Sequence, residues 1–429
     1  MYKQQLSKYF DEHFEEILKS MKEIMSIDST YQTPIEGKPF GEGSAKALEW
    51  GANFGKSLGL NVKNFDNYAI SMDFKDGDPK LGILSHLDVV PISDGWHYPP
   101  FDCTVDGDKI YGRGAIDDKG PSVAVLYAVK AIKDLGIPIK DNFRIIFGGN
   151  EEGGCGDIEY YQKKEDFPPM VFTPDGTFPV LNCEKGMMHL EFSASFEDDE
   201  IAEIVGGTVI NAIPNSCEVT YKTGEKSTYM GVSAHGSRPD LGDNAITQFT
   251  DSYNGNNKLI LGLQKLFNHE DYSGKSCGLG FSDDLTGEMS CALTLLNTKN
   301  GRLHGGIDIR FPIDRTLAEI SGIIKAKLTE AGFEIDDVEG MEPHHVPEDS
   351  PLVQALLEVY EEVKGEKGYC VAEGGITYVH NTEGGVAFGA EFVDENNNMH
   401  GADEHISIET FKYNLNMYAN AIIKICGEN

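Results

Sequence analysis

The residues best suited to chemistry are histidines and carboxylates that follow short apolar runs. His86 and Asp88 lie in the segment SHLDVVP, directly after the run LGIL. A histidine at a strand end can ligate a metal ion. An aspartate two residues on shares its face of the strand and can accept a hydrogen bond from the other ring nitrogen. Taken alone, a His-x-Asp pair is more often a structural histidine with its partner than a metal site.

A second acidic segment, GRGAIDDKGP, contains Asp117 and lies where a helix is expected to begin. An aspartate there can simply stabilise the helix N-terminus through its charge. The alternative is a carboxylate whose two oxygens bridge two metal ions, with nearby glycines that permit a tight backbone path. The segment by itself leaves both interpretations open.

Two adjacent glutamates, Glu151 and Glu152, follow the run RIIF in the segment GGNEEGG. Adjacent glutamates are usually solvated, but at the end of a buried strand one can ligate a metal ion while the other accepts a proton from water. Asp175 follows the run MVFT, and His400 lies in the late segment NMHG. Two histidines with several carboxylates suit a pair of zinc-like ions that share one bridging carboxylate.

These segments require a framework of alternating strands and helices. The three apolar runs predict strands, and residues 121–135 predict a helix that begins at a proline and ends before Gly136. This order predicts an α/β fold with a mostly parallel sheet covered on both faces. Ligands of such sheets bind beyond the carboxyl ends of the strands, where the polar segments lie.

The chain changes character near residue 185. Alternating runs such as MHLEFSAS and GIDIRF predict antiparallel strands, so this section indicates an α+β domain. We expect residues 185–343 to be a lid inserted into a catalytic domain formed by residues 1–184 and 344–429. Near the start, apolar residues from Leu6 to Met25 recur at helical spacing and predict one amphipathic helix.

Composition argues against several other classes of protein. The 429 residues include 36 basic and 70 acidic ones, and the net charge of −34 argues against nucleic acid and anionic membranes as partners. The first 28 residues lack the apolar core of a secretion signal, and no apolar run approaches the ~18 residues of a membrane span. Eight scattered cysteines without a CxxC pair are typical of reduced thiols, so we expect a cytoplasmic protein.

Six polar segments occur in a recognisable order along the chain. They are SHLDVVP, GRGAIDDKGP, GGNEEGG, TPDG, GVSAHGSRPDLGDNA and NMHG. In this order they resemble the motifs of peptidase family M20, the di-metal metallopeptidases that include aminoacylases, carboxypeptidases and dipeptidases. In length and in its large insertion the chain looks most like the peptidase V-type dipeptidases.

The resemblance implies a di-metal site, residue by residue. His86 and Asp175 hold one ion, Glu152 and His400 hold the other, and Asp117 bridges both. It implies two divalent ions per subunit. We expect zinc, with manganese or cobalt as alternatives, because oxygen-rich sites accept several ions.

The resemblance also implies catalytic roles. Asp88 orients the first histidine ligand, and Glu151 is the general base that activates the water between the ions. His235, in GVSAHGSRP, stabilises the oxyanion of the tetrahedral intermediate. The peptide bond after the bridging aspartate, Asp117–Asp118, is implied to be cis.

Four further residues are expected to contact the substrate. Asn211 in INAIPN and Arg310 in DIR match lid positions that bind the substrate's carbonyl and C-terminal carboxylate. Arginine suits a carboxylate because its planar fork donates two parallel hydrogen bonds. Gly375 and Thr377 belong to the segment GGIT, which resembles a Gly-Gly-Thr loop of the family but has an inserted isoleucine.

The expected protein is a monomeric metallohydrolase that cleaves dipeptides or short peptides with a free amino terminus. The first alternative is an N-acyl amino acid deacylase or desuccinylase of the same family, whose substrate has a blocked amino end. The second is a metal-binding protein without catalysis. The presence of all five ligand positions together with Glu151 argues against the second.

Overall fold

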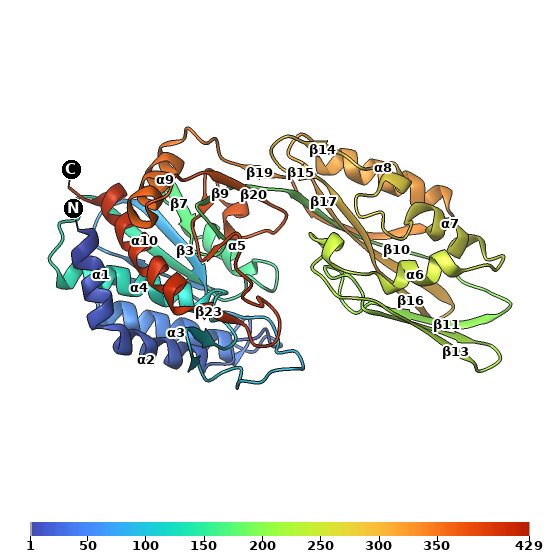
Figure 1. Cartoon of the computed structure of the whole chain (residues 1–429), viewed down its shortest axis with the longest axis horizontal. Coiled ribbons are helices and arrows are strands. Elements are labelled where there is room, and N and C mark those ends of the chain that lie inside the picture. The colour runs from blue at the N-terminus through green and yellow to red at the C-terminus, as the bar shows by residue number, and fades with distance from the viewer. Residues whose placement is uncertain (1, 429) are drawn as a thin grey trace. The chain divides into compact units, whose positions relative to one another are not determined.

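Apolar runs of the first half of the chain form the centre of one large sheet (Figure 1). The structure is a computed structural model and describes residues 2–428. The strand order is β1-β2-β6-β3-β7-β21-β9-β19, and β20 pairs with β9. The strands are β1 (Asn61–Phe65), β2 (Ala69–Asp73), β3 (Pro79–His86), β6 (Asn142–Gly148), β7 (Met170–Thr173), β9 (Val180–Glu184), β19 (His344–His345), β20 (Cys370–Glu373) and β21 (Val386–Ala387).

The centre of this sheet is parallel and its edges are antiparallel. β3 pairs in parallel with both β6 and β7, and β21 pairs in parallel with β7. β1 and β2 continue the sheet in antiparallel fashion on one side, and β9 does so on the other. The predicted α/β fold is therefore confirmed. The parallel part consists of β3, β6 and β7, which carry polar segments at their ends, together with β21.

Helices cover both faces of the sheet, because neighbouring side chains of a strand point to opposite sides. Ile83 and Ile145 pack in the larger core with residues of six helices, whereas Leu84 and Ile146 pack in a smaller core with residues of α5. The six helices are α1 (Lys3–Glu12), α2 (Phe14–Met25), α3 (Glu42–Ser57), α4 (Lys119–Asp134), α9 (Pro351–Lys364) and α10 (Ile408–Cys426), and α5 is Gly156–Gln162.

The amphipathic start of the chain forms two helices rather than the single one predicted. α1 and α2 are separated at His13, whose φ of −107° and ψ of 9° are not helical. The apolar spacing continues across this break, so Phe10 and Ile17 both enter the larger core. Periodicity could not reveal the break because the buried stripe is unchanged.

The chain divides into two compact units. The first consists of Met1–Asn182, Val346–Val371 and Thr377–Asn429, and the second of Cys183–His345 and Ala372–Ile376. Besides most of the large sheet, the first unit contains two smaller sheets. The short strands β4 (Thr104–Asp106), β5 (Lys109–Tyr111) and β23 (His405–Ser407) form one of three strands, and β8 (Thr177–Phe178) pairs with β22 (Glu391–Phe392).

The second unit is an antiparallel sheet of order β13-β12-β11-β16-β17-β10-β18 with its own hydrophobic core. Helices α6, α7 and α8 contribute to this core, which agrees with the predicted α+β character. The elements are β10 (Gly186–Ser195), β11 (Ile201–Gly206), β12 (Ser216–Tyr221), β13 (Lys226–Met230), α6 (Ala245–Ser252), α7 (Lys258–Leu266), β14 (Ser282–Asp283), β15 (Gly287–Glu288), β16 (Ser290–Lys299), β17 (Arg302–Phe311), α8 (Leu317–Glu330) and β18 (Glu334–Met341).

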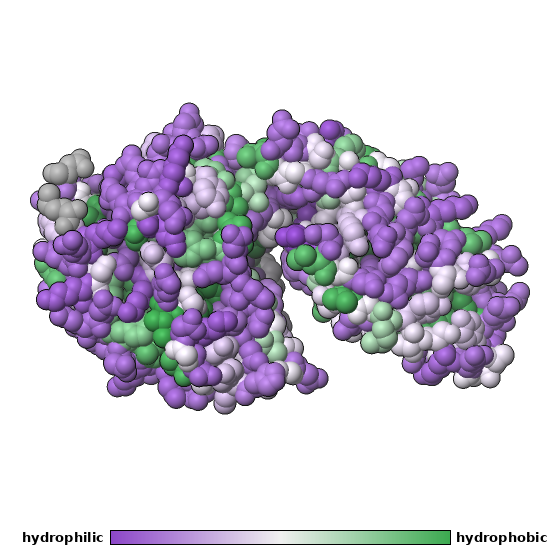
Figure 2. Space-filling model, in the orientation of Figure 1, coloured by the Kyte–Doolittle hydropathy of each residue, from purple (hydrophilic) through white to green (hydrophobic). Residues whose placement is uncertain are grey.

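Hydrophilic residues dominate the molecular face drawn in Figure 2, on the first unit as on the second. This accords with the 70 acidic residues of the chain, most of which serve as solvated surface charge. Within residues 2–428, no helix has the length and apolar character needed to cross a membrane.

Candidate metal centre

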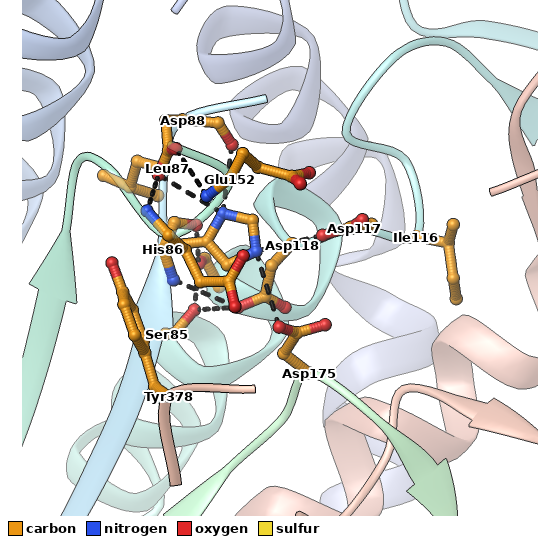
Figure 3. A network of polar contacts seen from close by, with 12 residues as sticks. Ser85, His86, Leu87, Asp88, Ile116, Asp117, Asp118, Glu152, Asp175 and Tyr378 are labelled. Atoms are coloured by element: carbon orange, nitrogen blue, oxygen red, sulfur yellow. Dashed lines mark hydrogen bonds and ion pairs between the residues drawn. The ribbon is translucent and has the colours of Figure 1, made fainter. Parts of the chain in front are cut away.

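His86 is the last residue of β3 and is buried at the carboxyl end of the parallel strands. Its Nδ1 lies 3.1 Å from the backbone oxygen of Asp88 and 3.4 Å from Asp88 Oδ1. Its Nε2 lies 2.9 Å from Asp117 Oδ1 and 3.5 Å from Asp175 Oδ2. Figure 3 shows the ring between Asp88 on one side and Asp175 on the other. One ring nitrogen is thus held by Asp88, while the other faces carboxylates.

Asp117 lies between the two histidines. Its Oδ1 faces His86, and its Oδ2 lies 2.8 Å from Nε2 of His400. His400 in turn lies 3.3 Å from Oε1 of Glu152. The residues therefore fall into two groups that share one carboxylate: His86 with Asp175, and His400 with Glu152. The Asp117–Asp118 peptide bond is cis, as the family resemblance implied.

Glu151 lies at the same end of the sheet. Ligand atoms of His86, Glu151 and Asp175 lie within 4.8 Å of one another, as do those of His86, Asp117 and Glu152. Burial, reinforced by the nearby carboxylates of Asp175 and Glu152, raises the pKa of Glu151 well above its usual range.

The site fits two divalent cations. His86 Nε2 and Glu152 Oε1 are buried and make no hydrogen bond to any described residue, although Nε2 lies 2.9 Å from Asp117 Oδ1 and Oε1 lies 3.3 Å from His400 Nε2. Because His86 Nδ1 donates to the backbone oxygen of Asp88, the neutral ring presents a lone pair at Nε2. Burial raises the pKa of Glu152 to about 7. Although burial opposes the charge of His400, Asp117 and Glu152 raise its pKa to about 11. Crowded buried carboxylates of this kind are stabilised by bound cations, and imidazole with carboxylate oxygen is a donor set that divalent cations accept.

Asp88 also organises the loop that carries the glutamates. Its Oδ1 accepts a hydrogen bond from the backbone N–H of Glu151, and its Oδ2 accepts one from that of Glu152, both at 3.1 Å. One carboxylate therefore orients the imidazole of His86 and fixes the backbone of two acidic residues. Such contacts around the ligands govern how well a metal site is preorganised.

A second buried acid, Asp157, holds the start of the same loop. Its Oδ2 accepts hydrogen bonds from the backbone N–H groups of Gly149, at 2.6 Å, and Asn150, at 2.7 Å, and from the hydroxyl of Tyr378. Neither Asp157 nor Tyr378 was singled out from the sequence. The sequence feature that could have pointed to Asp157 is its position in the first turn of α5, directly after the glycine-rich segment.

The second unit brings together His235, expected to stabilise the oxyanion, and Asn211, expected to contact substrate. His235 is exposed, its segment forms an antiparallel bridge with Ala212, and Gly236 N–H donates to the oxygen of Asn211 at 2.7 Å. The backbone N–H of Ser237 donates to Nδ1 of His235 at 3.2 Å. Since Nδ1 accepts, the neutral ring carries its proton on Nε2 and can donate from there.

Arg310 is buried on β17 and is held by Asp308, two residues before it on the same face. Its Nε donates to Asp308 Oδ1 at 2.8 Å, and its Nη2 donates to Oδ2 at 3.0 Å. Its Nη1 donates to the oxygen of Gly374, the neighbour of Gly375, at 3.1 Å. Burial alone would raise the pKa of Asp308, but Arg310 and His189 lower it below its usual range, so the Asp308 carboxylate stays ionised.

Thr377 belongs to the first unit, unlike the other three residues expected to contact substrate. Its hydroxyl accepts from the backbone N–H of Val379 at 3.4 Å and so caps the short 3₁₀ helix Tyr378–Asn381. The following residue, Tyr378, is buried and reaches Asp157. The GGIT segment thus begins in one unit and ends in the other.

A match to a known family accompanies this geometry. The model of peptidase family M20/M25/M40 matches residues 82–424. The chain belongs to this family. The predicted resemblance and the classification as a peptidase are confirmed.

Relatives of this family are similar over nearly the whole chain. The β-Ala-Xaa dipeptidase of Lactobacillus delbrueckii subsp. lactis is 33% identical over 95% of this chain and 96% of that protein. The putative dipeptidase YtjP of Bacillus subtilis (strain 168) is 31% identical over 96% and 97%. Human carnosine dipeptidase 1 shares the fold with a TM-score of 0.67, at 18% identity and 99% coverage of both chains. The dipeptidase Dug1p of Saccharomyces cerevisiae does so with a TM-score of 0.68, at 14% identity and coverage of 99% and 98%.

Proposed function

We propose that this protein is a metal-dependent dipeptidase that cleaves dipeptides or short peptides with a free amino terminus. The observation that carries the proposal is the shared carboxylate of Asp117, whose two oxygens face His86 at 2.9 Å and His400 at 2.8 Å. Two bound divalent ions would polarise the peptide carbonyl and would lower the pKa of a water molecule. The names of the relatives support the substrate class.

In the proposed reaction this chain's residues move one proton and stabilise one charge. Glu151 accepts the proton of the attacking water and later delivers it to the leaving amine. His235 donates from Nε2 to the oxyanion, in agreement with the Ser237 N–H that occupies its Nδ1. Arg310 binds the C-terminal carboxylate of the substrate, and Asn211 binds its carbonyl. Gly375 and Thr377 line the substrate site.

The proposed cofactor is a pair of zinc ions, with manganese or cobalt as alternatives. His86 and Asp175 are assigned to one ion, Glu152 and His400 to the other, and Asp117 to both. The assigned donors are imidazole nitrogens and carboxylate oxygens, and such a mixed set of donors accepts each of these metals. Activity restored to metal-free protein by each ion in turn identifies the one that functions.

We also propose that residues 185–343 act as a lid on a catalytic domain formed by residues 1–184 and 344–429, in a monomeric cytoplasmic protein. The eight cysteines are all unpaired, which is typical of a reducing compartment. The net charge of −34 supports a small peptide rather than nucleic acid or an anionic membrane as the partner.

The test is a panel of dipeptides offered to metal-loaded, chelated and metal-restored protein. The panel contains α-aminoacyl and β-alanyl dipeptides, each with a free and with an acylated amino end. We expect hydrolysis of the free dipeptides, loss on chelation and recovery on metal addition. Glu151→Ala is expected to keep its metal content and lose turnover. Preferential cleavage of acylated substrates indicates a deacylase instead, and no cleavage by metal-replete protein refutes the proposal.

A further inference from the structure

An ion pair between Arg113 and Glu404 lies beside the candidate metal residues and has no role in the steps above. Both side chains are fully buried, and Nη1 of Arg113 donates to Oε2 of Glu404. The two residues are distant in sequence: Arg113 lies four residues before Asp117, and Glu404 lies four residues after His400. The pair therefore joins the two segments that supply the shared carboxylate and the second histidine.

Glu404 holds the backbone that presents Asp117. Its Oε1 accepts from the backbone N–H of Ile116 at 3.2 Å and, more weakly, from that of Asp117 at 3.4 Å. Its backbone oxygen accepts from Gly112 N–H at 2.9 Å, so the segment from Gly112 to Asp117 is fixed at both ends by one residue. Burial raises the pKa of Glu404 to about 7, and the Arg113 guanidinium opposes this rise.

Arg113 holds the backbone that presents His400. Its Nη2 donates to the oxygen of His400 at 3.0 Å and to that of Pro91 at 3.3 Å. Its guanidinium also lies 5.4 Å from the centre of the Trp96 ring. His400 has a left-handed backbone, with φ of 63°, and 44% of its side chain is exposed.

We propose that Arg113 and Glu404 are positioning residues for the metal ion assigned to Glu152 and His400. The inference rests on the proposed function, because it presupposes that this site binds metal. A buried ion pair is weak evidence for a contribution to stability, since its desolvation can cancel its attraction. In this ion pair, Arg113 contacts the backbone of His400 and Glu404 contacts the backbone of Asp117. The pair therefore sets the spacing between Asp117 and His400.

The experiment is a Zn²⁺ titration of metal-free full-length protein by isothermal titration calorimetry, with bound zinc counted by mass spectrometry. We expect wild type to bind two ions. Arg113→Gln is expected to bind one of them about 10–100-fold more weakly, the range typical of residues that orient metal ligands, and the other within about threefold of wild type. Glu404→Gln is expected to weaken the same ion and, because Glu404 holds the backbone of the shared Asp117, to weaken the other ion as well, but less. The double variant is expected to bind no more weakly than the worse single variant.

Two reference variants separate positioning from general damage. His400→Ala removes a ligand of the affected ion, so adding Arg113→Gln to it is expected to change the remaining ion little. Asp73→Asn breaks another ion pair of the same unit, in which Asp73 accepts from Arg144 at 2.8 and 3.0 Å. Arg144 lies near the start of β6, whereas Gly148, paired with His86, lies at its end. Asp73→Asn is therefore expected to bind both ions as wild type does.

The outcomes are distinguishable from failure of the proposed function. If wild type binds no zinc, the proposed function fails. If wild type binds two ions and the Arg113 and Glu404 variants bind both with wild-type affinity, only this inference fails. Equal weakening of both ions in Arg113→Gln, or the same weakening in Asp73→Asn, also overturns it. If Arg113→Gln does not fold, Arg113→Lys serves as the test, because it keeps the charge but cannot reach Glu404 and His400 with one planar fork.

Discussion

The carboxylate of Asp88 accepts the backbone N–H of Glu151, the proposed general base, at 3.1 Å. The same carboxylate accepts the N–H of Glu152 and lies 3.4 Å from Nδ1 of His86. Asp88 therefore links His86, a proposed metal ligand on β3, with the loop after β6. Its importance extends beyond the orientation of one imidazole, because the backbone of the proposed base and of a proposed ligand of the other ion is held by it as well.

Replacement of Asp88 by alanine is expected to impair both metal binding and turnover. It frees the N–H groups of Glu151 and Glu152, while the backbone oxygen of residue 88 still accepts from His86 Nδ1. We expect metal affinity and kcat each to fall about 10–100-fold, as is typical when a residue behind the ligands is lost. Metal titration and steady-state kinetics measure the two effects.

Asp88→Asn is the matched control for this prediction. The amide keeps the size of the side chain and one accepting oxygen, so it retains one of the two loop contacts. We expect its kcat to lie between those of wild type and Asp88→Ala. If Asp88→Ala keeps the wild-type kcat, its contacts with the loop of Glu151 and Glu152 do not contribute to turnover, whatever the metal content of the variant.

The stability of metal-free protein is expected to depend on pH through Asp157. Burial raises the pKa of Asp157 to about 6, against ~3.9 in an unfolded chain, so the folded state holds this proton more tightly. The stabilisation is present below pH ~4 and lost as pH rises to about 6. The difference of about two pKa units corresponds to about 3 kcal/mol in the free energy of unfolding.

Denaturant unfolding of wild type and Asp157→Asn at several pH values between 4 and 7 tests this. Asparagine keeps an oxygen for the N–H groups of Gly149 and Asn150 but does not titrate. We expect its unfolding free energy to fall less with rising pH than that of wild type over this range. The exposed Asp78 supplies the control, as Asp78→Asn is expected to retain the wild-type profile. Parallel profiles for wild type and Asp157→Asn contradict the assignment.

The sequence was sufficient to predict the parallel core of the fold and the groups gathered at its edge. His86, Glu151 and Asp175 each follow an apolar run, and parallel strands end at one edge of a sheet, so their approach follows from topology. The division of the ligands between two ions came from the family resemblance. Periodicity and strand order alone do not determine which oxygen of Asp117 faces which histidine.

Residues that act through the backbone were not predictable in the same way. Arg113 and Glu404 form an ion pair although almost 300 residues separate them in the chain. No local sequence pattern predicts a contact over such a separation. Asp308 precedes Arg310 by two residues, and that spacing was visible in the segment DIR. That spacing brings the two side chains together only because β17 is a strand, in which residues two apart lie on one face.

Arg310 is expected to select substrates with a free C-terminal carboxylate. Asp308 occupies Nε and one hydrogen of Nη2, and Gly374 occupies one hydrogen of Nη1, so two guanidinium hydrogens remain for a ligand. Arg310→Lys loses the planar fork, and we expect KM for dipeptides to rise about 10–100-fold with a smaller change in kcat.

A dipeptide with an amidated C-terminus is the control substrate for Arg310. Wild type is expected to prefer the free acid over the amide, and Arg310→Lys to lose most of that preference. Asp308→Asn is expected to act in the same direction, because the guanidinium loses the charge that orients it. An unchanged acid-to-amide ratio in Arg310→Lys excludes the proposed role of this residue.

His235 is expected to act on the rate of the chemical step and not on metal binding. Because Ser237 N–H donates to Nδ1 at 3.2 Å, the neutral ring carries its proton on Nε2, the nitrogen proposed to face the oxyanion. Removal of one such donor typically costs about 10²–10³ in kcat, so we expect this loss in His235→Ala with KM and zinc content near wild type. Ser237→Ala removes the hydroxyl 2.7 Å from Nδ1 but keeps the backbone N–H, and so should lower kcat far less. If His235→Ala keeps wild-type kcat, the oxyanion is stabilised without it. If it loses zinc instead, the residue acts on the metal site and its assigned role is wrong.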